Sequence, residues 1–166
     1  HQGLRCMFHM MNEARIAIGM AATMLGQAGY EASLDYAKTR TQGRPLGVDT
    51  RAGPPQAGAV PLGGEAAQAA SGGKLGKDAT RPPVRLIEHA DIRRMLLAQK
   101  STCEGALALL LYCAKLVDEQ HTGDAAQADE ARLLLEVLTP IAKSWPSENC
   151  LEANSLAIQI HGGYGY

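Results

Sequence analysis

The stretch Ala153–Tyr166, ANSLAIQIHGGYGY, joins a run of small and apolar residues to a glycine-rich end. The run is typical of the last turns of a helix, and Gly162 and Gly163 fit a helix C-terminus because glycine reaches positive φ at little cost. A second interpretation is that the glycines leave the backbone bare, so that a large ligand can lie against it with Gln159 as a polar contact. Both interpretations end a helix here, and they differ in whether a ligand lies beside it.

The composition of the 166 residues favours closely packed helices over a sheet. Aromatic residues make up only 4% of the chain, while alanine, leucine, methionine and glycine are frequent and β-branched runs are few. Lys and Arg number 16 against 17 Asp and Glu, which gives a net charge of −1. This balance predicts no basic surface of the kind that nucleic acid binding requires.

Four scattered cysteines form no C-x-x-C pair, which predicts reduced thiols at partly buried positions of a cytoplasmic protein. No signal peptide is recognisable, and no apolar run is long enough to span a bilayer. The chain starts at His1 and stops at Tyr166. We therefore expect a single helical domain over 1–166, either behind a tag remnant or as a fragment of a longer chain.

Helical periodicity predicts a first helix from about Met10 to Arg40 and a second from about Leu86 to Glu119. Residues three and four apart in the first helix predict a buried stripe of Ala14, Ile18, Ala21, Leu25, Ala28, Ala32 and Tyr36. The corresponding stripe of the second helix is Ile92, Met95, Leu96, Gln99, Cys103, Ala106, Leu110, Cys113 and Val117. An alanine-rich stripe allows a neighbouring helix to come close.

Two further helices are predicted in the last third of the chain. The third runs from about Ala125 to Lys143 with a kink at Pro140, and the fourth starts after Pro146 with Ser147 as N-cap. Their predicted buried lines are Ala131, Leu134, Leu138, Ile141 and Trp145, and then Leu151, Asn154 and Ile158. Mostly short links between these elements predict an all-α fold, a four-helix antiparallel (up-down) bundle.

The segment 45–83 differs from the rest in composition. It holds 8 of the 18 glycines and 6 of the 8 prolines, and neither a helical nor a strand period survives in it. Such a composition is typical of a flexible loop. A stretch of this length without structure is uncommon inside a domain, so we interpret it as an insertion between two helices.

Charged and polar residues near the helix ends have two interpretations each. Arg40 and Arg44 suit a helix C-terminus, but two arginines around Gln42 also suit a diphosphate, because guanidinium groups bind phosphate oxygens bidentately. His89 sits in a first turn, where a histidine caps, is exposed, or binds a ligand. Arg15 lies near the start of its helix, where a cation opposes the helix dipole unless it is solvated.

No catalytic set is recognisable. The sequence contains no defensible Ser/His/Asp arrangement, no paired carboxylates for acid–base work, and no His/Cys cluster with metal-ligand spacing. We therefore expect no metal site. As a free-standing enzyme the chain is poorly equipped.

Four segments together resemble the C-terminal helical domain of FAD-dependent acyl-CoA dehydrogenases, of the large bacterial branch that acts on longer fatty acyl-CoAs. They occur in the order MMNEAR (10–15), YAKTRTQGR (36–44), IEHADIRRML (87–96) and IQIHGGYGY (158–166). Each motif alone is weak, but four in order are specific. The resemblance covers nearly the whole chain apart from 45–83.

The resemblance implies a bundle that packs against an N-terminal helical domain and a β-domain. It implies oxidation of fatty acyl-CoA to trans-2-enoyl-CoA, with electrons passed to an electron-transfer flavoprotein, in a homo-oligomer (dimer or tetramer). The family's catalytic glutamate belongs to a motif expected beyond Tyr166. The resemblance therefore implies that this chain alone is inactive and does not hold FAD tightly.

The resemblance also implies roles for individual residues. Arg40 is similar to the arginine that reaches the FAD diphosphate of a neighbouring subunit, and Gln42 to a flavin-contacting position beside it. His89 falls at an adenosine-side contact. The remaining implied residues are Gln159, Gly162 and Gly163 around the ADP part of FAD, and Asn12 and Arg15 near the acyl-CoA.

Other functions remain open on the sequence. Within the same fold, an acyl-CoA oxidase or a flavin monooxygenase would carry similar motifs. Outside enzymes, a helical module used only for self-association would show the same periodicity.

Overall fold

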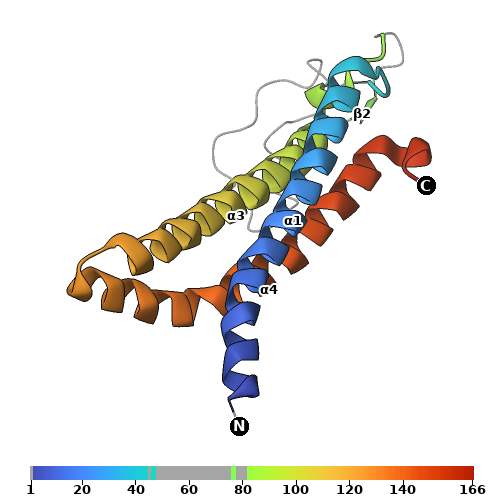
Figure 1. The fold of residues 1–166 in the computed structure, drawn as a ribbon. Helices are drawn as coiled ribbons and strands as arrows, with labels where there is room; N and C mark the ends of the chain where they lie inside the picture. The colour runs from blue at the N-terminus through green and yellow to red at the C-terminus, as the bar shows by residue number, and fades with distance from the viewer. Residues whose placement is uncertain (1, 45, 48–75, 78–81) are drawn as a thin grey trace, which may run out of the picture.

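Three long α-helices make up most of the chain (Figure 1). The structure is a computed structural model that describes residues 2–44, 46–47, 76–77 and 82–166, apart from the side chains of His9, Asn12, Leu46 and Lys77. Most of the predicted insertion at 45–83 lies outside these described residues. The elements are α1 (Gly3–Thr39), β1 (Leu46–Gly47), β2 (Gly76–Lys77), the 3₁₀ turn η1 (Leu86–Glu88), α3 (Ala90–Thr122), α4 (Ala125–His161) and the 3₁₀ turn η2 (Gly162–Tyr164).

The predicted third and fourth helices are one helix, so the described residues form three long helices instead of four. α4 continues through Pro140 and Pro146, and the Ser147 hydroxyl donates to the Lys143 carbonyl at 2.7 Å instead of capping a new helix. Each proline removes one backbone hydrogen bond, which bends a helix without having to end it. Figure 1 shows this bend part-way along α4, and the two arms take the places of the two predicted helices.

The helix directions also differ from an up-down bundle. Along α1, Gly19, Gly26 and Gly29 face Ala142, Cys150 and Asn154 of α4 in the same order, so α1 and the second arm of α4 run parallel. α3 runs antiparallel to both, because Leu110 lies near Gly19 while Cys103 lies near Gly26. The C-terminal ends of α1 and α4 therefore reach the same end of the bundle (Figure 1).

The buried face of α1 is not the predicted stripe. Leu25 and Ile18 are 67% and 48% exposed, and the stripe's alanines are exposed as well. The buried residues of α1 are instead small or polar: Gly19, Thr23, Gly26, Ser33 and Ala37. A Cβ atom at Gly19 would lie 2.1 Å from the Ala142 carbonyl oxygen, so backbone contact between helices selects this face over hydrophobicity.

The predicted stripe of α3 is confirmed at its centre. The buried residues of α3 are Leu96, Gln99, Cys103, Ala106, Leu110, Cys113 and Leu116. Cys103 lies against Cys150 of α4, and burial raises the pKa of the Cys103 thiol to about 11. Three of the four cysteines are free and buried, as predicted, and Cys6 is exposed.

The predicted buried lines of α4 are partly wrong. Ala131 and Asn154 lie inward as expected, but Leu151 is 71% exposed and Ile158 and Trp145 are also exposed. The core-facing residues are Ala131, Leu135, Thr139, Ala142, Pro146, Cys150, Ala153, Ala157 and Ile160. These residues recur three or four positions apart along the whole of α4, so one helical period runs through the bend, and the wrongly predicted residues lie beside this face.

A tight connection joins α3 to α4 and begins α4. The Asp124 carboxylate accepts hydrogen bonds from the backbone nitrogens of Ala126 (3.0 Å) and Gln127 (2.9 Å), and the Gln127 side chain accepts one from the Asp124 nitrogen. This capping box satisfies backbone donors that the first turn of a helix leaves unpaired. The sequence spacing Asp-x-x-Gln carries this signal.

A buried polar pair sets how α1 lies against α3. The Ser33 hydroxyl donates to the Gln99 side-chain oxygen at 3.1 Å, and both residues are fully buried. We expect Ser33→Ala to lower the free energy of unfolding by about 1–3 kcal/mol, because the Gln99 oxygen loses its donor in the interior. The double variant Ser33→Ala/Gln99→Met should recover part of that loss. Urea unfolding of the wild type, Ser33→Ala, Gln99→Met and the double variant measures these values, and a double variant less stable than the sum of the single changes would contradict the pairing.

Candidate functional site

A pocket of about 450 Å³ lies where the C-terminal ends of α1 and α4 meet. Arg40 and Gln42 enter it from the end of α1, and Gln159, Gly162 and Gly163 from the end of α4. The structure thus brings together five of the six residues predicted to bind a cofactor. The complete lining is Tyr36, Arg40, Gln42, Leu86, Ile92, Gln159, Ile160, His161, Gly162, Gly163 and Tyr164.

The glycine-rich end of the chain ends a helix and also forms a wall of this pocket. Gly162 has φ +59° and its nitrogen donates to the Gln159 and Ile158 carbonyls, as expected of a helix C-cap. A Cβ atom at Gly162 or Gly163 would have no heavy atom within 4 Å, so open space lies beside the backbone. Both interpretations of the stretch are therefore compatible, because the backbone that ends α4 is also accessible to a ligand.

Arg40 provides the charge of the pocket. It is the C-cap of α1, its nitrogen donates to the Tyr36 carbonyl at 2.9 Å, and its side chain is exposed. Among the described residues that line the pocket, Arg40 is the only arginine, lysine, aspartate or glutamate. A guanidinium beside accessible glycine backbone is suited to an anionic group such as a phosphate.

Aromatic rings form the floor between the two helix ends. The rings of Tyr36 and His161 are stacked with centroids 4.8 Å apart, and the Tyr164 ring lies 6.2 Å from that of Tyr36. His161 is oriented by its Nδ1, which lies 2.8 Å from the Ala157 carbonyl oxygen. These contacts connect α1 to α4 at the base of the pocket and hold the two walls together.

His89 is not among the described residues that line the pocket. Its Nε2 atom is 2.8 Å from the Gln42 carbonyl oxygen, so the ring contacts the backbone of a lining residue. The predicted contact between His89 and a cofactor stays a prediction. The structure adds a different partner for this side chain, which the sequence did not indicate.

Comparison with known proteins identifies the family. The sequence pattern described as "Acyl-CoA dehydrogenase, C-terminal domain" matches residues 1–51 and 74–166. The chain belongs to the acyl-CoA dehydrogenase family. The unmatched residues, 52–73, fall within the segment predicted to be an insertion.

Curated acyl-CoA dehydrogenases are similar over the whole chain. A 3-methylmercaptopropionyl-CoA dehydrogenase of Ruegeria pomeroyi is 32% identical over 166 residues, which are 100% of this chain and 23% of that protein. A butyryl-CoA dehydrogenase of Syntrophomonas wolfei is 32% identical over 99% of this chain and 22% of its own length. The broad-specificity linear acyl-CoA dehydrogenase FadE5 of Mycobacterium tuberculosis is 29% identical over 100% of this chain and 23% of its length. The chain thus spans less than a quarter of these relatives.

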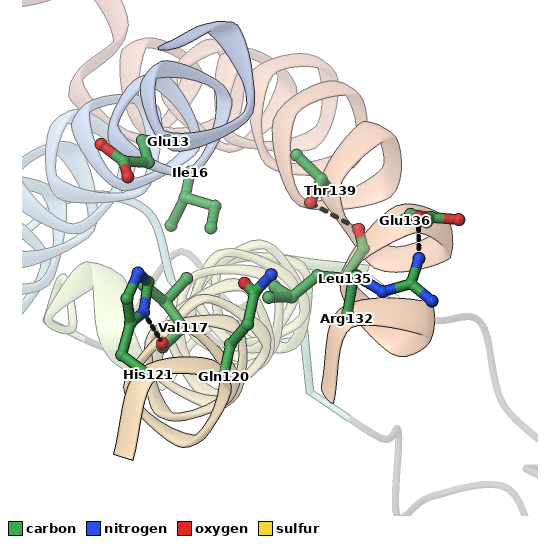
Figure 2. Close-up of a pocket in the computed structure, with 9 residues that line it drawn as sticks. All are labelled: Glu13, Ile16, Val117, Gln120, His121, Arg132, Leu135, Glu136 and Thr139. Atoms are coloured by element: carbon green, nitrogen blue, oxygen red, sulfur yellow. Dashed lines mark hydrogen bonds and ion pairs between the residues drawn. The ribbon is translucent and has the colours of Figure 1, made fainter. Parts of the chain in front are cut away.

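A second pocket of about 220 Å³ lies toward the other end of this acyl-CoA dehydrogenase chain, among α1, α3 and α4 (Figure 2). Its apolar walls are Ile16, Val117 and Leu135, and its polar rim is Glu13, Gln120, His121, Arg132, Glu136 and Thr139. Figure 2 shows Arg132 paired with Glu136, at 2.9 Å, so the one arginine of this pocket is already neutralised. This pocket therefore offers less to an anion than the one at Arg40.

The two residues predicted to lie near acyl-CoA are on the first half of α1. Arg15 is half-buried, interacts with a neighbouring group, and lines neither pocket. The Asn12 side chain lies outside the part of the chain that the structure describes. Both roles stay predictions.

Several lining residues of the first pocket were missed from the sequence. Tyr36 lies one turn before the predicted residue Arg40, and helical spacing was the available signal, because residues three and four apart share a face. His161 is two residues from Gln159, so helical spacing did not indicate it. Among the described residues, no helix is long and apolar enough to cross a membrane. Within the same described ranges, no group of three His, Cys, Asp or Glu residues could hold a metal ion.

Proposed function

We propose that this chain is the C-terminal helical part of an FAD-dependent acyl-CoA dehydrogenase and that the pocket at Arg40 receives the diphosphate and ADP part of FAD. The observation that carries the proposal is the convergence of Arg40, Gln42, Gln159, Gly162 and Gly163, from separate segments of the chain, on one open pocket. The chemistry of the site fits this group. The guanidinium of Arg40 can bind a phosphate group, and the backbone of Gly162 and Gly163 permits close approach of the ligand.

In the proposed reaction, the residues of this chain bind and orient FAD. Arg40 neutralises diphosphate charge, and Gln42 and Gln159 supply amide donors and acceptors at the pocket walls. When bound, FAD supplies the acceptor for the hydride removed as fatty acyl-CoA becomes trans-2-enoyl-CoA. We place the catalytic glutamate in sequence beyond Tyr166, so no acid–base step is assigned to residues 1–166.

One chain contributes to two catalytic centres in this proposal. Arg15 precedes Arg40 by 25 residues on α1, which corresponds to about 37 Å of helix at 1.5 Å per residue. This distance separates the proposed acyl-CoA residues Asn12 and Arg15 from the proposed FAD pocket. A homo-oligomer resolves the separation if Arg40 serves a neighbouring subunit's FAD while Arg15 serves its own centre. Electrons would leave to an electron-transfer flavoprotein, and we place the enzyme in the cytoplasm.

The isolated 166-residue chain should neither hold FAD nor oxidise acyl-CoA, whereas the full-length protein should do both. The physical reason is that the pocket is open on one side, so tight binding of a dinucleotide needs walls from other domains and a second subunit. Anaerobic titration with a fatty acyl-CoA, followed by the flavin absorbance, measures this directly. Bleaching of stoichiometric flavin bound to the isolated chain would contradict the proposal. Oxygen consumption measured alongside separates a dehydrogenase from an oxidase.

A further inference from the structure

The segment that carries Arg40 and Gln42 is held against the start of α3 by a set of backbone hydrogen bonds. The Leu86 nitrogen donates to the Arg40 carbonyl at 2.9 Å, and the Gln42 nitrogen donates to the Val84 carbonyl at 2.9 Å. The Val84 nitrogen donates to the Gly43 carbonyl at 3.0 Å. None of these bonds uses the Gln42 carbonyl, and it is the carbonyl that His89 contacts at 2.8 Å.

The backbone at Gly43 is shaped to admit the His89 ring. Gly43 has φ +76°, a conformation that residues with a Cβ rarely adopt. A Cβ atom there would lie 3.2 Å from both the Cε1 and Nε2 atoms of His89. The imidazole therefore lies close against the glycine, and any side chain at 43 would push on the ring that holds Gln42.

The turn that carries His89 is itself braced. The Nε of Arg93 donates to the Ile87 carbonyl at 2.8 Å, and one of its terminal nitrogens donates to the Glu88 carbonyl at 3.1 Å. His89 is the N-cap of α3, and the neighbouring 3₁₀ turn packs Leu86 into the core. The imidazole is thus presented from a rigid element, whereas Gln42 lies in a segment that follows the end of α1.

We propose that His89 is a positioning residue for the cofactor pocket: it holds the Gln42 carbonyl so that the Arg40 and Gln42 side chains line the pocket, and it does not itself touch the cofactor. This inference rests on the proposed function. A carbonyl oxygen can only accept, so the proton of the contact must be on Nε2. The side chain of His89 contacts the backbone of this segment. Its removal does not take away any of the backbone hydrogen bonds between residues 40–43 and 84–86.

The test is FAD affinity in the full-length holoprotein. We expect His89→Ala to weaken FAD binding by roughly 3- to 10-fold, the range that follows from losing one hydrogen bond. His89→Gln, whose amide nitrogen can replace Nε2, should stay within about 2-fold of the wild type by the same reasoning. Gly43→Ala should weaken FAD binding at least as much as His89→Ala, because it displaces the same ring.

A matched control lies at the opposite end of α3. The Nδ1 atom of His121 lies 2.8 Å from the Val117 carbonyl oxygen, so this imidazole also contacts a backbone carbonyl (Figure 2). His121 does not line the pocket at Arg40. His121→Ala should leave FAD affinity unchanged. Should His89→Ala not fold, His89→Phe keeps a ring of similar shape without either nitrogen and is expected to show the same loss.

Two outcomes would overturn the positioning role. One is wild-type affinity in His89→Ala, and the other is a His89→Gln variant as weak as His89→Ala, which would indicate direct contact between the imidazole and FAD. The proposed function fails separately, since it requires that Arg40→Ala lose FAD. If Arg40→Ala loses FAD and His89→Ala does not, only the positioning role is rejected.

Discussion

Arg40→Ala is expected to weaken FAD binding by the full-length protein roughly 10- to 100-fold, because a charge-assisted hydrogen bond contributes about 1.5–3 kcal/mol. Of the pocket-lining residues that the structure describes, only Arg40 is an arginine, lysine, aspartate or glutamate. Its removal would leave the diphosphate facing neutral amides and glycine backbone. Dialysis of the purified protein, followed by flavin absorbance and fluorescence titration of the flavin-free form with FAD, measures the loss.

Two controls sharpen this prediction. Arg40→Lys keeps the charge but not the planar, bidentate donor set, and should fall between the wild type and Arg40→Ala. Arg94→Ala removes an exposed arginine from α3, where it pairs with Asp91 at 2.7 Å, and should leave FAD affinity unchanged. Equal FAD affinity in Arg40→Ala and the wild type would show that this pocket does not receive the diphosphate.

Gly19→Ala adds one methyl group and is expected to lower the free energy of unfolding by about 2–4 kcal/mol, a large effect for so small a change. The new Cβ would lie 2.1 Å from the Ala142 carbonyl oxygen and 2.9 Å from a Leu110 methyl carbon. The first contact is with backbone, which no rotamer change can relieve. α1 and α4 would have to separate, and the cavities that this opens add to the loss.

The comparison is with Gly105→Ala on α3. Gly105 is exposed, and an added Cβ would meet only a Trp145 ring carbon, at an ordinary 3.7 Å. Alanine is favoured over glycine in a helix by about 1 kcal/mol, so Gly105→Ala should be neutral or stabilising. Chemical unfolding of both variants separates helix propensity from helix contact. A Gly19→Ala variant as stable as Gly105→Ala would mean that α1 and α4 are not in backbone contact.

The residues of the candidate site were predictable from the sequence, but the helix arrangement that places them around one pocket was not. Arg40, Gln42, Gln159, Gly162 and Gly163 were all predicted from motifs that resemble a known family. Their meeting in one pocket depends on α1 and the second arm of α4 being parallel, since only then do both C-terminal ends lie together (Figure 1). An antiparallel arrangement, as predicted, would have put them at opposite ends.

The partner of His89 could not be found from the sequence either. The contact joins residues 47 positions apart, and its acceptor is a backbone carbonyl that every residue carries. Arg93 is a second example, because both of its acceptors are carbonyls of the neighbouring turn. Side-chain motifs identify which groups can donate, but they do not identify which carbonyl is left over to accept.

The sequence by itself determined the helical character of the chain, the core stripe of α3 from Leu96 to Cys113, and the family to which the chain belongs. The spacing of apolar residues and the order of motifs can be read along the chain, without knowing which helices pack together. Only the tertiary structure decided that α4 continues through Pro140 and Pro146 and that α1 buries Gly19 and Gly26 instead of Leu25. The physical reason is that helices in backbone contact select faces by size, and the neighbour that makes size matter is distant in the sequence.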